Sequence, residues 1–534
     1  MAKYIPPAVL SIILAVLAVL CIPSFGDAQL LYQPYSYQFY QKLNSDLYSP
    51  SNNLHTSLKP FVINDSSSVR AAYLAILNNG VDTSHKSWLY RKVFNEHLFD
   101  VKNNEFTFYF DYLPDLLIGR EFEAHNSTWL NTRGYQAGGT IGKKFFFYTS
   151  GFENQGKFPA YLNQYVIKTG TVPGQAFDFN GGVGTKDWAY VTTLLGYAPS
   201  NGLIIEGGID KTFIGDGYRS VLLSDFAQNY PLLRIKFNIG KRIQYMAMWA
   251  YLQDHLAQEF DPPGLHPPNR AKWAAFHYVD WNITNRASLG FFNALITPDA
   301  YDDGTRHGFD VNYINPILFS KSLAPTGPIP DNTLLGLNGK YKVLSKTTIY
   351  GQLIYDQSSS TANTKDGFQL GVRGSDLFQI HAFNYLLEYN TVKPYTYSTQ
   401  YPLINYTELQ EPLAHPFGAN FKELVGILNY SIGRFDFQGQ LNYAKYGLDM
   451  NNINYGGNLL LADVSPQGSD TGQGLSTTFK YAQGTVAFII NPKYNLRIEA
   501  GAVLRQETNS QSDNKTMLIT FGLRSSFRNL YTDF

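Results

Sequence analysis

The chain has 534 residues, and its 42 basic and 42 acidic side chains cancel to a formal net charge of zero. That balance argues against a strongly basic nucleic-acid-binding protein. Tyrosine (39) and phenylalanine (37) are abundant while charged residues make up only 16% of the chain, a bias that favours many strands with aromatic-rich surfaces.

Residues 1–28 have the pattern of a cleaved secretory signal peptide. A lysine precedes an apolar run from Ala8 to Leu20, and the small residues Gly26 and Ala28 predict cleavage after Ala28. The run of about 13 apolar residues is shorter than the roughly 20 that a membrane-spanning helix needs. Cys21 could suggest a lipoprotein, but Leu20 stands where a lipobox has a small residue. Cleavage removes the only cysteine, so we expect no disulfide in the exported chain.

Residues 29–100 are predicted to form a small helical element, either periplasmic or a plug at the mouth of the part that follows. The stretches SYQFYQKLNSDLYSP and SSVRAAYLAILNN are typical of short helices, and NLHTSLKP between them is a predicted loop that ends at a proline. In the second helix four apolar residues can share one face: Val69, Tyr73, Leu74 and Ile76.

From residue 101 to residue 534, several segments alternate apolar and polar residues, as the strands of a membrane barrel do. Examples are EFTFYFDY from Glu105, RIQYMAMWAY from Arg242, RFDFQGQLNY from Arg434 and YNLRIEAGAVLRQ from Tyr494. In the third example, aromatic and aliphatic residues occupy one face, and the other face holds Asp436, Gln438, Gln440 and Asn442.

Alternation alone does not separate a membrane barrel from a soluble antiparallel sandwich. Segments of about 9–12 residues are longer than the usual globular strand, and their apolar faces often end in aromatic residues. The opposite faces hold Arg, Glu, Asp and Gln, which a sandwich core tolerates badly. No segment after the first offers about 18 consecutive apolar residues, which excludes helical spans. We therefore predict an all-β transmembrane antiparallel barrel (residues 101–534) of about 18 strands, within 16–20.

The last segment, MLITFGLRSSFRNLYTDF, ends the chain on Phe534. Its alternating apolar face consists of Met517, Ile519, Phe521 and Leu523. A last strand that ends in phenylalanine resembles the signal that outer-membrane assembly machinery reads. We therefore predict that this strand ends at Phe534 and that Phe534 is an assembly signal.

The loops offer one candidate metal site. The proline-rich stretch DPPGLHPPNRAKW and the acidic stretch TPDAYDDGTRHGFD are expected on the outside, where such barrels carry long loops. Asp299, Asp302 and Asp303 could bind a hard cation such as calcium, but their spacing matches no EF-hand. The histidines stand singly, without a zinc-binding spacing. We expect neither a metal nor a cofactor.

The stretch GIDKTFIGDGYRSVLLSDFAQNYPLLRI is the most chemically suggestive part of the chain. It lacks the lysine of a phosphate-binding loop, and neither of its serines lies in a Gly-x-Ser-x-Gly elbow. With no catalytic constellation, we predict a non-enzymatic protein. Asp216, Arg219 and Asp225 can form charge-assisted bonds inside a barrel, which is the interpretation we favour, and they are also candidate ligand-binding residues.

Three aromatic residues near a predicted loop and strand are candidates for sugar binding: Trp273, Tyr278 and Trp281. Aromatic rings beside Arg, Asp and Asn suit carbohydrate rings, whose faces are apolar and whose edges are polar. The alternative interpretation is an aromatic girdle at the membrane interface.

Four stretches together resemble a known family: LEYNTVKPYTYS, EPLAHPFGANFKELVGILNY, NLHTSLKP and the glycine-containing stretch that begins at Gly207. They are similar to the Wzi-like outer-membrane family of capsule assembly and, within it, to the RemB branch of gliding bacteria. The resemblance covers residues 54–534 and implies a barrel of about 18 strands with an N-terminal helical plug. It departs at Lys393 and at Ser398-Thr399, where the family usually has Arg and Ser-His. Because of these departures no ligand role is carried over from the family, and Lys393 and Tyr395 are candidate ligand-binding residues inferred from this chain alone.

The resemblance implies a protein of the Gram-negative outer membrane that binds, anchors or organises surface (capsular) polysaccharide, or that supports gliding and adhesion. Its expected partners are outer-membrane lipid, surface polysaccharide and proteins of a gliding or secretion apparatus, and not nucleic acid. The alternative is a porin-like diffusion channel, in which the same charged lining would select small solutes.

Overall fold

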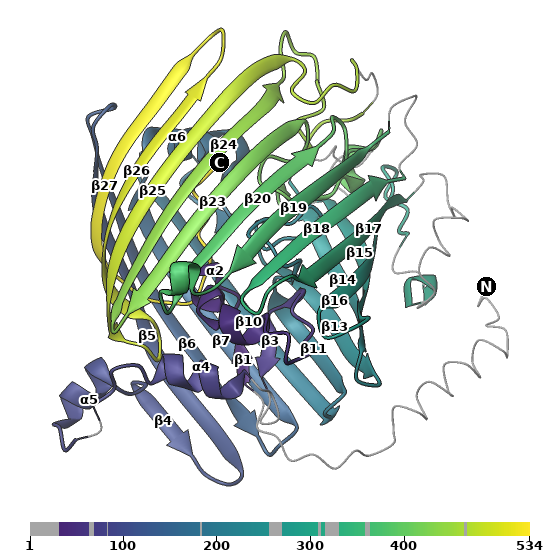
Figure 1. Cartoon of the computed structure of the whole chain (residues 1–534). Coiled ribbons are helices and arrows are strands. Elements are labelled where there is room, and N and C mark those ends of the chain that lie inside the picture. Colours follow the sequence, from purple (N-terminus) through teal and green to yellow (C-terminus); the bar gives the residue numbers. More distant parts are fainter. Residues whose placement is uncertain are drawn as a thin grey trace, which may run out of the picture.

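Strands with one apolar and one polar face can close into a barrel, and the computed structural model is such a closed antiparallel sheet (Figure 1). It describes residues 31–63, 69–82, 84–181, 184–255, 270–307, 311–314, 331–357, 364–463 and 467–534. Within these residues 18 strands form the wall, so the predicted all-β barrel is confirmed. The predicted signal peptide and most of the proline-rich loop lie outside the described residues.

Each wall strand pairs with the next wall strand along the chain, and β27 closes the sheet by pairing with β5. The wall consists of β5 (Phe106–Glu121), β6 (Asn126–Ile141), β7 (Phe145–Lys157), β10 (Lys186–Ser200), β11 (Leu203–Asp210), β13 (Tyr230–Ile239), β14 (Ile243–Asp254), β15 (Arg270–Asn282), β16 (Ala287–Pro298), β17 (Asn332–Lys342), β18 (Thr347–Asp356), β19 (Asp366–Gly374), β20 (Phe383–Val392), β23 (Phe421–Ile432), β24 (Phe435–Leu448), β25 (Leu475–Asn491), β26 (Leu496–Thr508) and β27 (Asp513–Arg524). A short strand, β4 (Phe99–Lys102), pairs with the first half of β5, and β27 pairs with its second half.

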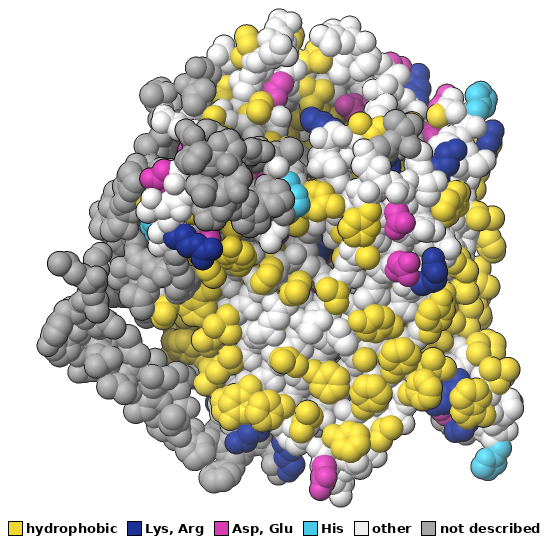
Figure 2. All heavy atoms as spheres, turned by 180° about the vertical axis from the view of Figure 1, so that it is seen from behind, with side chains coloured by type: hydrophobic (Ala, Val, Ile, Leu, Met, Phe, Trp, Pro, Cys, Tyr) yellow, Lys and Arg dark blue, Asp and Glu magenta, His cyan; other side chains and the backbone are white. Residues whose placement is uncertain are grey.

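The predicted alternation separates the outside of the wall from the lumen. In β24, Phe437, Leu441 and Tyr443 are exposed on the outside, whereas Gln440 and Asn442 are buried inside. Figure 2 shows hydrophobic side chains over much of the outer wall. This distribution suits a wall that contacts lipid outside and polar groups inside.

One part of the wall is apolar on both faces. In β14 the inward side chains Met246, Met248, Ala250 and Leu252 are buried, and Trp249 and Tyr251 point outward. The inward groups pack against Leu222 and its neighbours in a segment inside the barrel. A filled lumen thus allows apolar residues on an inner face that the barrel pattern would make polar.

The two ends of the barrel differ in the length of their connections. At one end the strands join through short turns such as residues 142–144 and 201–202, and the wall also begins with β5 and finishes with β27 at this end. At the other end lie long connections such as residues 299–331 and 393–420. In outer-membrane barrels short turns face the periplasm, so we name these the periplasmic and the extracellular end. Within the described residues no helix could cross a membrane.

The two predicted N-terminal helices are present. The first is divided into α2 (Tyr37–Tyr40), η1 (Gln41–Leu43) and α3 (Asn44–Leu47), and the second is α4 (Arg70–Leu77). In α4, Tyr73 and Leu77 are buried, whereas Leu74 is exposed, so the predicted face is wrong at Leu74. The buried face of α4 differs from the predicted one because Tyr73 and Leu77, which are four residues apart, pack on the same cluster. The other elements of this region are β1 (Leu31–Gln33), β2 (Leu58–Lys59), β3 (Phe61–Ile63) and α5 (Trp88–Phe94).

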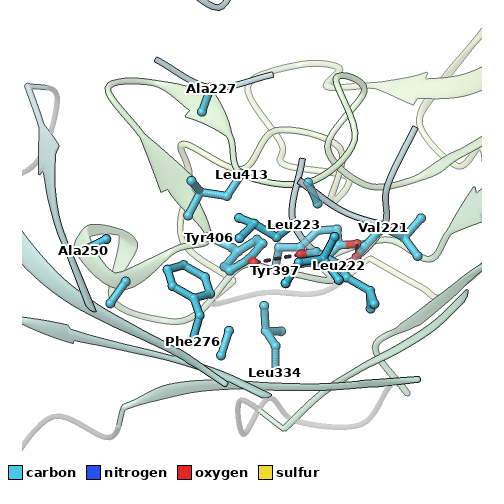
Figure 3. Packing of buried hydrophobic residues seen from close by; sticks show 14 of the residues in the cluster. Val221, Leu222, Leu223, Ala227, Ala250, Phe276, Leu334, Tyr397, Tyr406 and Leu413 are labelled. Carbon is cyan, nitrogen blue, oxygen red and sulfur yellow. Dashed lines mark hydrogen bonds between the residues drawn. The ribbon is translucent and has the colours of Figure 1, made fainter. Parts of the chain in front are cut away.

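Several other segments turn into the lumen. Residues 211–229, here named the lumen loop, connect β11 to β13 and include β12 (Phe213–Ile214). Residues 158–185 include α6 (Ala160–Thr169), β8 (Thr171–Val172) and β9 (Ala176–Phe177), and residues 393–420 include η4 (Pro402–Ile404), β21 (Thr407–Glu408) and β22 (Glu411–Pro412). Two further short helices are η2 (Val311–Ile314) and η3 (Leu377–Gln379). Figure 3 shows Val221, Leu222 and Leu223 of the lumen loop packed among residues of the wall and of the 393–420 connection.

The last strand ends earlier than the sequence suggests. Its outward face contains Met517, Ile519 and Phe521 as predicted, but β27 stops at Arg524. Residues 525–534, here named the C-terminal tail, return into the lumen, where Phe534 packs against Phe226 with ring centroids 5.5 Å apart. The prediction that Phe534 ends the last strand is therefore wrong, because apolar contacts inside the barrel hold the tail there. Its role in assembly stays a prediction.

Candidate functional site

The lumen loop contains the chemically suggestive stretch of the sequence, and its glycines allow it to lie against the wall. A side chain at Gly217 would place its Cβ 2.1 Å from the Glu388 carboxylate of β20. At Gly215, which has a φ of 148°, the Cβ would lie 2.5 Å from Gln352 of β18. Only glycine permits this approach, so the Gly-Asp-Gly sequence brings the backbone of the loop onto polar wall side chains.

Asp216, between these glycines, joins the N-terminal region to the loop. Its carboxylate accepts hydrogen bonds from Tyr48 Oη at 2.9 Å, Thr56 Oγ1 at 2.5 Å and Ser57 Oγ at 2.6 Å. The Lys340 ammonium of β17 lies 3.4 Å away. All of these groups are buried. The predicted loop NLHTSLKP thus supplies two of the three donors that surround this acid.

The electrostatics keep Asp216 ionised. Burial alone would raise the pKa of its carboxyl, but Lys340 and Lys59, with the hydroxyl donors, hold that pKa well below its usual value. The same burial disfavours the charged form of Lys59 and lowers the pKa of its ammonium to about 7. The Lys59 Nζ donates to the carbonyl of Gly215 at 2.7 Å. Asp216, Lys59 and Lys340 therefore form a buried ion cluster, and each of the three has partners within the protein.

Arg219 joins the same loop to the C-terminal tail. Its Nη2 donates to Asp533 Oδ2 at 2.9 Å and to Glu423 Oε1 of β23 at 3.3 Å. Its guanidinium also lies over the Tyr218 ring, 4.8 Å from the centroid. Burial alone would lower the pKa of Arg219, but the two carboxylates raise it well above its usual value. This arginine therefore stays charged and bridges the loop, the wall and the tail.

Asp225 makes a second connection to the tail. Its carboxylate accepts hydrogen bonds from Asn529 Nδ2 at 2.7 Å and Tyr531 Oη at 2.6 Å. Together, Asp216, Arg219 and Asp225 connect the lumen loop to residues 48–57 and to the C-terminal tail. This arrangement agrees with the structural interpretation of the stretch, while their ligand-binding role stays a prediction.

The three aromatic candidates do not lie together. Trp273 and Trp281 point outward near opposite ends of β15, and Trp281 is exposed. Trp273 Nε1 donates to Asp299 Oδ1 at 2.8 Å. Tyr278 points inward and is buried, with its hydroxyl accepting from Asn338 Nδ2 at 3.2 Å. The positions of the two tryptophans fit the aromatic girdle better than one sugar platform.

Lys393 and Tyr395 follow β20 at the extracellular end. Lys393 Nζ lies 2.6 Å from Asp366 Oδ1, and both side chains are more than one third exposed. Tyr395 is buried, and its hydroxyl donates to the carbonyl of Asn454 at 2.8 Å. Lys393 is thus accessible from outside, whereas Tyr395 holds the 393–420 connection against the loop after β24.

The acidic residues of the candidate metal site are separately engaged. Arg270 lies 3.0 Å from Asp302 Oδ1, and Tyr401 also donates to Asp302. Asp303 accepts a hydrogen bond from the backbone of Thr305 at 2.8 Å. Among the described residues no group of three or more histidine, cysteine or acidic side chains has the geometry of a metal site. Arg270, Asp302 and Tyr401 form a polar cluster at the extracellular mouth.

The sequence reasoning missed the tail as a source of lumen contacts. Asp533 receives hydrogen bonds from Arg219 and from the Gln440 Nε2 of β24 at 2.5 Å. Arg528 lies 3.0 Å from Asp115 of β5 and over the Phe152 ring. A signal was present, because alternation of apolar and polar residues ceases after Arg524.

Cavities remain between these inner segments and the wall. One of about 180 Å³ lies between the α6 segment, the tail and strands that include β25 and β26, and Gln483, Glu499 and Arg524 are among its lining residues. Another of about 70 Å³ lies near Ser150, Tyr190 and Arg528. These two volumes suit a few water molecules more than a chain of sugar rings. A third cavity, of about 350 Å³, lies at the periplasmic end, and His55, Lys236 and Gln244 are among its lining residues.

Comparisons with known proteins place the fold. The chain matches no protein-family model and no curated protein sequence. Among solved structures it is similar to Wzi of Escherichia coli, described as a carbohydrate-binding β-barrel involved in group 1 capsule assembly, with a TM-score of 0.54 and 14% identity over 93% of this chain and 100% of that one. Pseudomonas aeruginosa OprD is more distant, with a TM-score of 0.43 and 10% identity over 78% of this chain and 94% of that one. The chain therefore has the fold of an outer-membrane β-barrel.

Proposed function

We propose that this protein is a non-enzymatic outer-membrane barrel that binds, anchors or organises surface polysaccharide at its extracellular end. The observation that carries the proposal is the occupied lumen. One apolar cluster includes Met246 and Met248 of β14, Leu222 of the lumen loop, and Phe479 of β25, and these two strands lie on opposite sides of the barrel. Such a cluster leaves the extracellular surface as the place where a long polymer can be held.

The likeness to a carbohydrate-binding barrel over nearly the whole chain supports the same proposal. The resemblance to the RemB branch adds a second expectation, that the protein supports gliding or adhesion by holding polysaccharide at the cell surface. We further propose that residues 1–28 are cleaved on export and that residues 29–100 form the periplasmic plug. In this proposal proteins of a gliding or secretion apparatus are partners at the cell envelope.

Within this proposal, Lys393 and Tyr401 contact the polymer, and the buried Arg270, which donates to Tyr401 Oη at 3.0 Å, holds that ring in place. Both lie at the extracellular end, and they combine charge with an aromatic ring, which suits an acidic polysaccharide. Charge-assisted hydrogen bonds to carboxylates of the polymer would supply the affinity, and the Tyr401 ring would supply an apolar surface for a sugar face.

The test uses the purified full-length protein in detergent and acidic polysaccharide extracted from the same cells. We expect Lys393→Ala and Tyr401→Ala to weaken retention of the polysaccharide. Lys346→Ala is the control, because Lys346 is an exposed lysine that also pairs with an aspartate, Asp376, but at the periplasmic end. Equal retention by the wild type, the variants and the control would refute the assignment of the site. If surface polysaccharide and gliding are unchanged after the gene is deleted, the proposed function is refuted.

Electrical conductance across planar bilayers distinguishes the alternative function, a diffusion channel, from polysaccharide binding. The polysaccharide-binding proposal expects no steady current, because the apolar cluster crosses the lumen. Persistent open currents from the full-length protein would instead support the channel.

A further inference from the structure

The outer wall carries a groove where β23 to β27 lie side by side (Figure 1). Its volume is about 600 Å³. Two small residues, Gly426 and Ala482, line it, and a side chain at Gly426 would meet its nearest neighbour, Leu387, only at 3.9 Å. The walls of the groove are apolar and are formed by Leu424, Leu441, Tyr443, Ala482, Leu504 and Met517.

Four exposed lysines lie at the extracellular end of this groove. Lys480 and Lys515 line it directly. Lys422 of β23 and Lys445 of β24 are paired across the two strands, one outward position beyond Leu424 and Tyr443. Their side chains point outward because each alternates with buried neighbours.

The protein places fewer carboxylates than lysines at this end of the groove. Lys515 pairs with Asp513 at 3.0 Å, and Glu123 lines the edge of the groove. Among the described residues, no carboxylate lies within ion-pair distance of Lys422, Lys445 or Lys480. A direct cross-strand pair of like charges, as in Lys422 and Lys445, costs stability on its own. A bound anion would remove that cost.

The position of the lysines indicates where the anion comes from. They lie beside the apolar outer face and near the extracellular ends of their strands, where the outer leaflet meets water. A comparable groove of about 580 Å³ on β13–β15 is lined by Leu233, Trp249, Tyr251 and Trp273 and contains no lysine. The positive charge is thus a feature of one groove and not of every hollow in the wall.

We propose that this groove binds a phosphorylated lipid of the outer leaflet. An acyl chain occupies the apolar hollow below Tyr443 and Met517, and the phosphate contacts Lys480 and Lys515, with Lys422 and Lys445 beside it. The site is independent of the polysaccharide proposal, because its residues face lipid and not the lumen. It would hold the barrel in a fixed orientation to the surrounding outer leaflet.

The experiment measures lipid binding by the full chain in nanodiscs of phosphatidylcholine with a small fraction of diphosphoryl lipid A. The variant carries K422Q, K445Q, K480Q and K515Q. Its matched control carries K102Q, K143Q, K144Q and K241Q, four exposed lysines at the periplasmic end. We expect the first set to weaken binding by about tenfold or more and the control set to leave it unchanged, since each lysine near a membrane surface adds to anion binding.

Two further measurements separate charge from shape. Gly426→Leu keeps all four lysines and fills the groove, and we expect it to weaken lipid A binding without changing the salt dependence. Lipid A without phosphates should bind the wild type as weakly as the diphosphoryl form binds the quadruple lysine variant. Unchanged binding by both the lysine variant and Gly426→Leu, with both variants folded by their heat-dependent mobility, would overturn the proposal.

Discussion

Replacement of Asp216 by alanine tests the central contact of the lumen. The carboxylate accepts three short hydrogen bonds, from Tyr48, Thr56 and Ser57, and lies opposite Lys340. Its removal leaves these donors and a buried ammonium without their acceptor. Breaking a buried ion pair by removing one partner costs about 3–5 kcal/mol. The wall keeps its own interstrand hydrogen bonds, so we expect the loss to appear in the N-terminal region and not in the barrel.

The assay is limited proteolysis of the protein in detergent, with cleavage followed within residues 31–77. A loss of about 3–5 kcal/mol in local stability corresponds to opening that is more frequent by roughly 10²-fold to 4 × 10³-fold, because about 1.4 kcal/mol is a factor of ten. Cleavage should accelerate by a similar factor if opening limits it. Asp216→Asn should give an intermediate rate, since the amide keeps one acceptor and loses the charge.

Asp303→Ala is the control, because it removes the same charge from an exposed loop where the side chain accepts one backbone hydrogen bond. Cleavage at the wild-type rate in Asp216→Ala would refute the reasoning that this acid anchors the N-terminal region. Unfolding of the wall together with that region, seen as loss of heat-dependent mobility, would refute the view that the effect is local.

Three further predictions concern the loops, the tail and the lumen. Burial raises the pKa of Glu408 to about 8 from an ordinary 4.5, so its contribution to stability is complete below pH 4.5 and is lost as the pH rises through 8. Glu408→Gln should therefore flatten the fall of the thermal midpoint between about pH 5 and 8, and an unchanged slope would contradict it. Removal of Phe534 should lower the amount of barrel at the cell surface, and normal surface levels would argue against the assembly signal. Deletion of residues 525–534 should create conductance in planar bilayers if the tail helps to block the lumen, and continued silence would mean that the other inner segments suffice.

The alternation of side chains was sufficient to predict the wall. In β24 each residue lies on the face that its position in RFDFQGQLNY predicts, since successive side chains of a strand point to opposite sides. The helices before the barrel could be predicted for a similar local reason, the spacing of residues such as Tyr73. The exposed face of α4 could not, because Leu74 and Leu77 are equally apolar and only the packing partner distinguishes them.

The sequence by itself determined the class of wall and its approximate number of strands, because these follow from a period of two residues along each strand. Only the tertiary structure decided what fills the lumen. Asp216 meets Tyr48 and Arg219 meets Asp533 across separations of more than a hundred residues. Such contacts depend on which surfaces come together when the sheet closes, and no local pattern specifies that. The physical reason is that a buried charge needs a partner in space, and its position along the chain does not restrict where that partner lies.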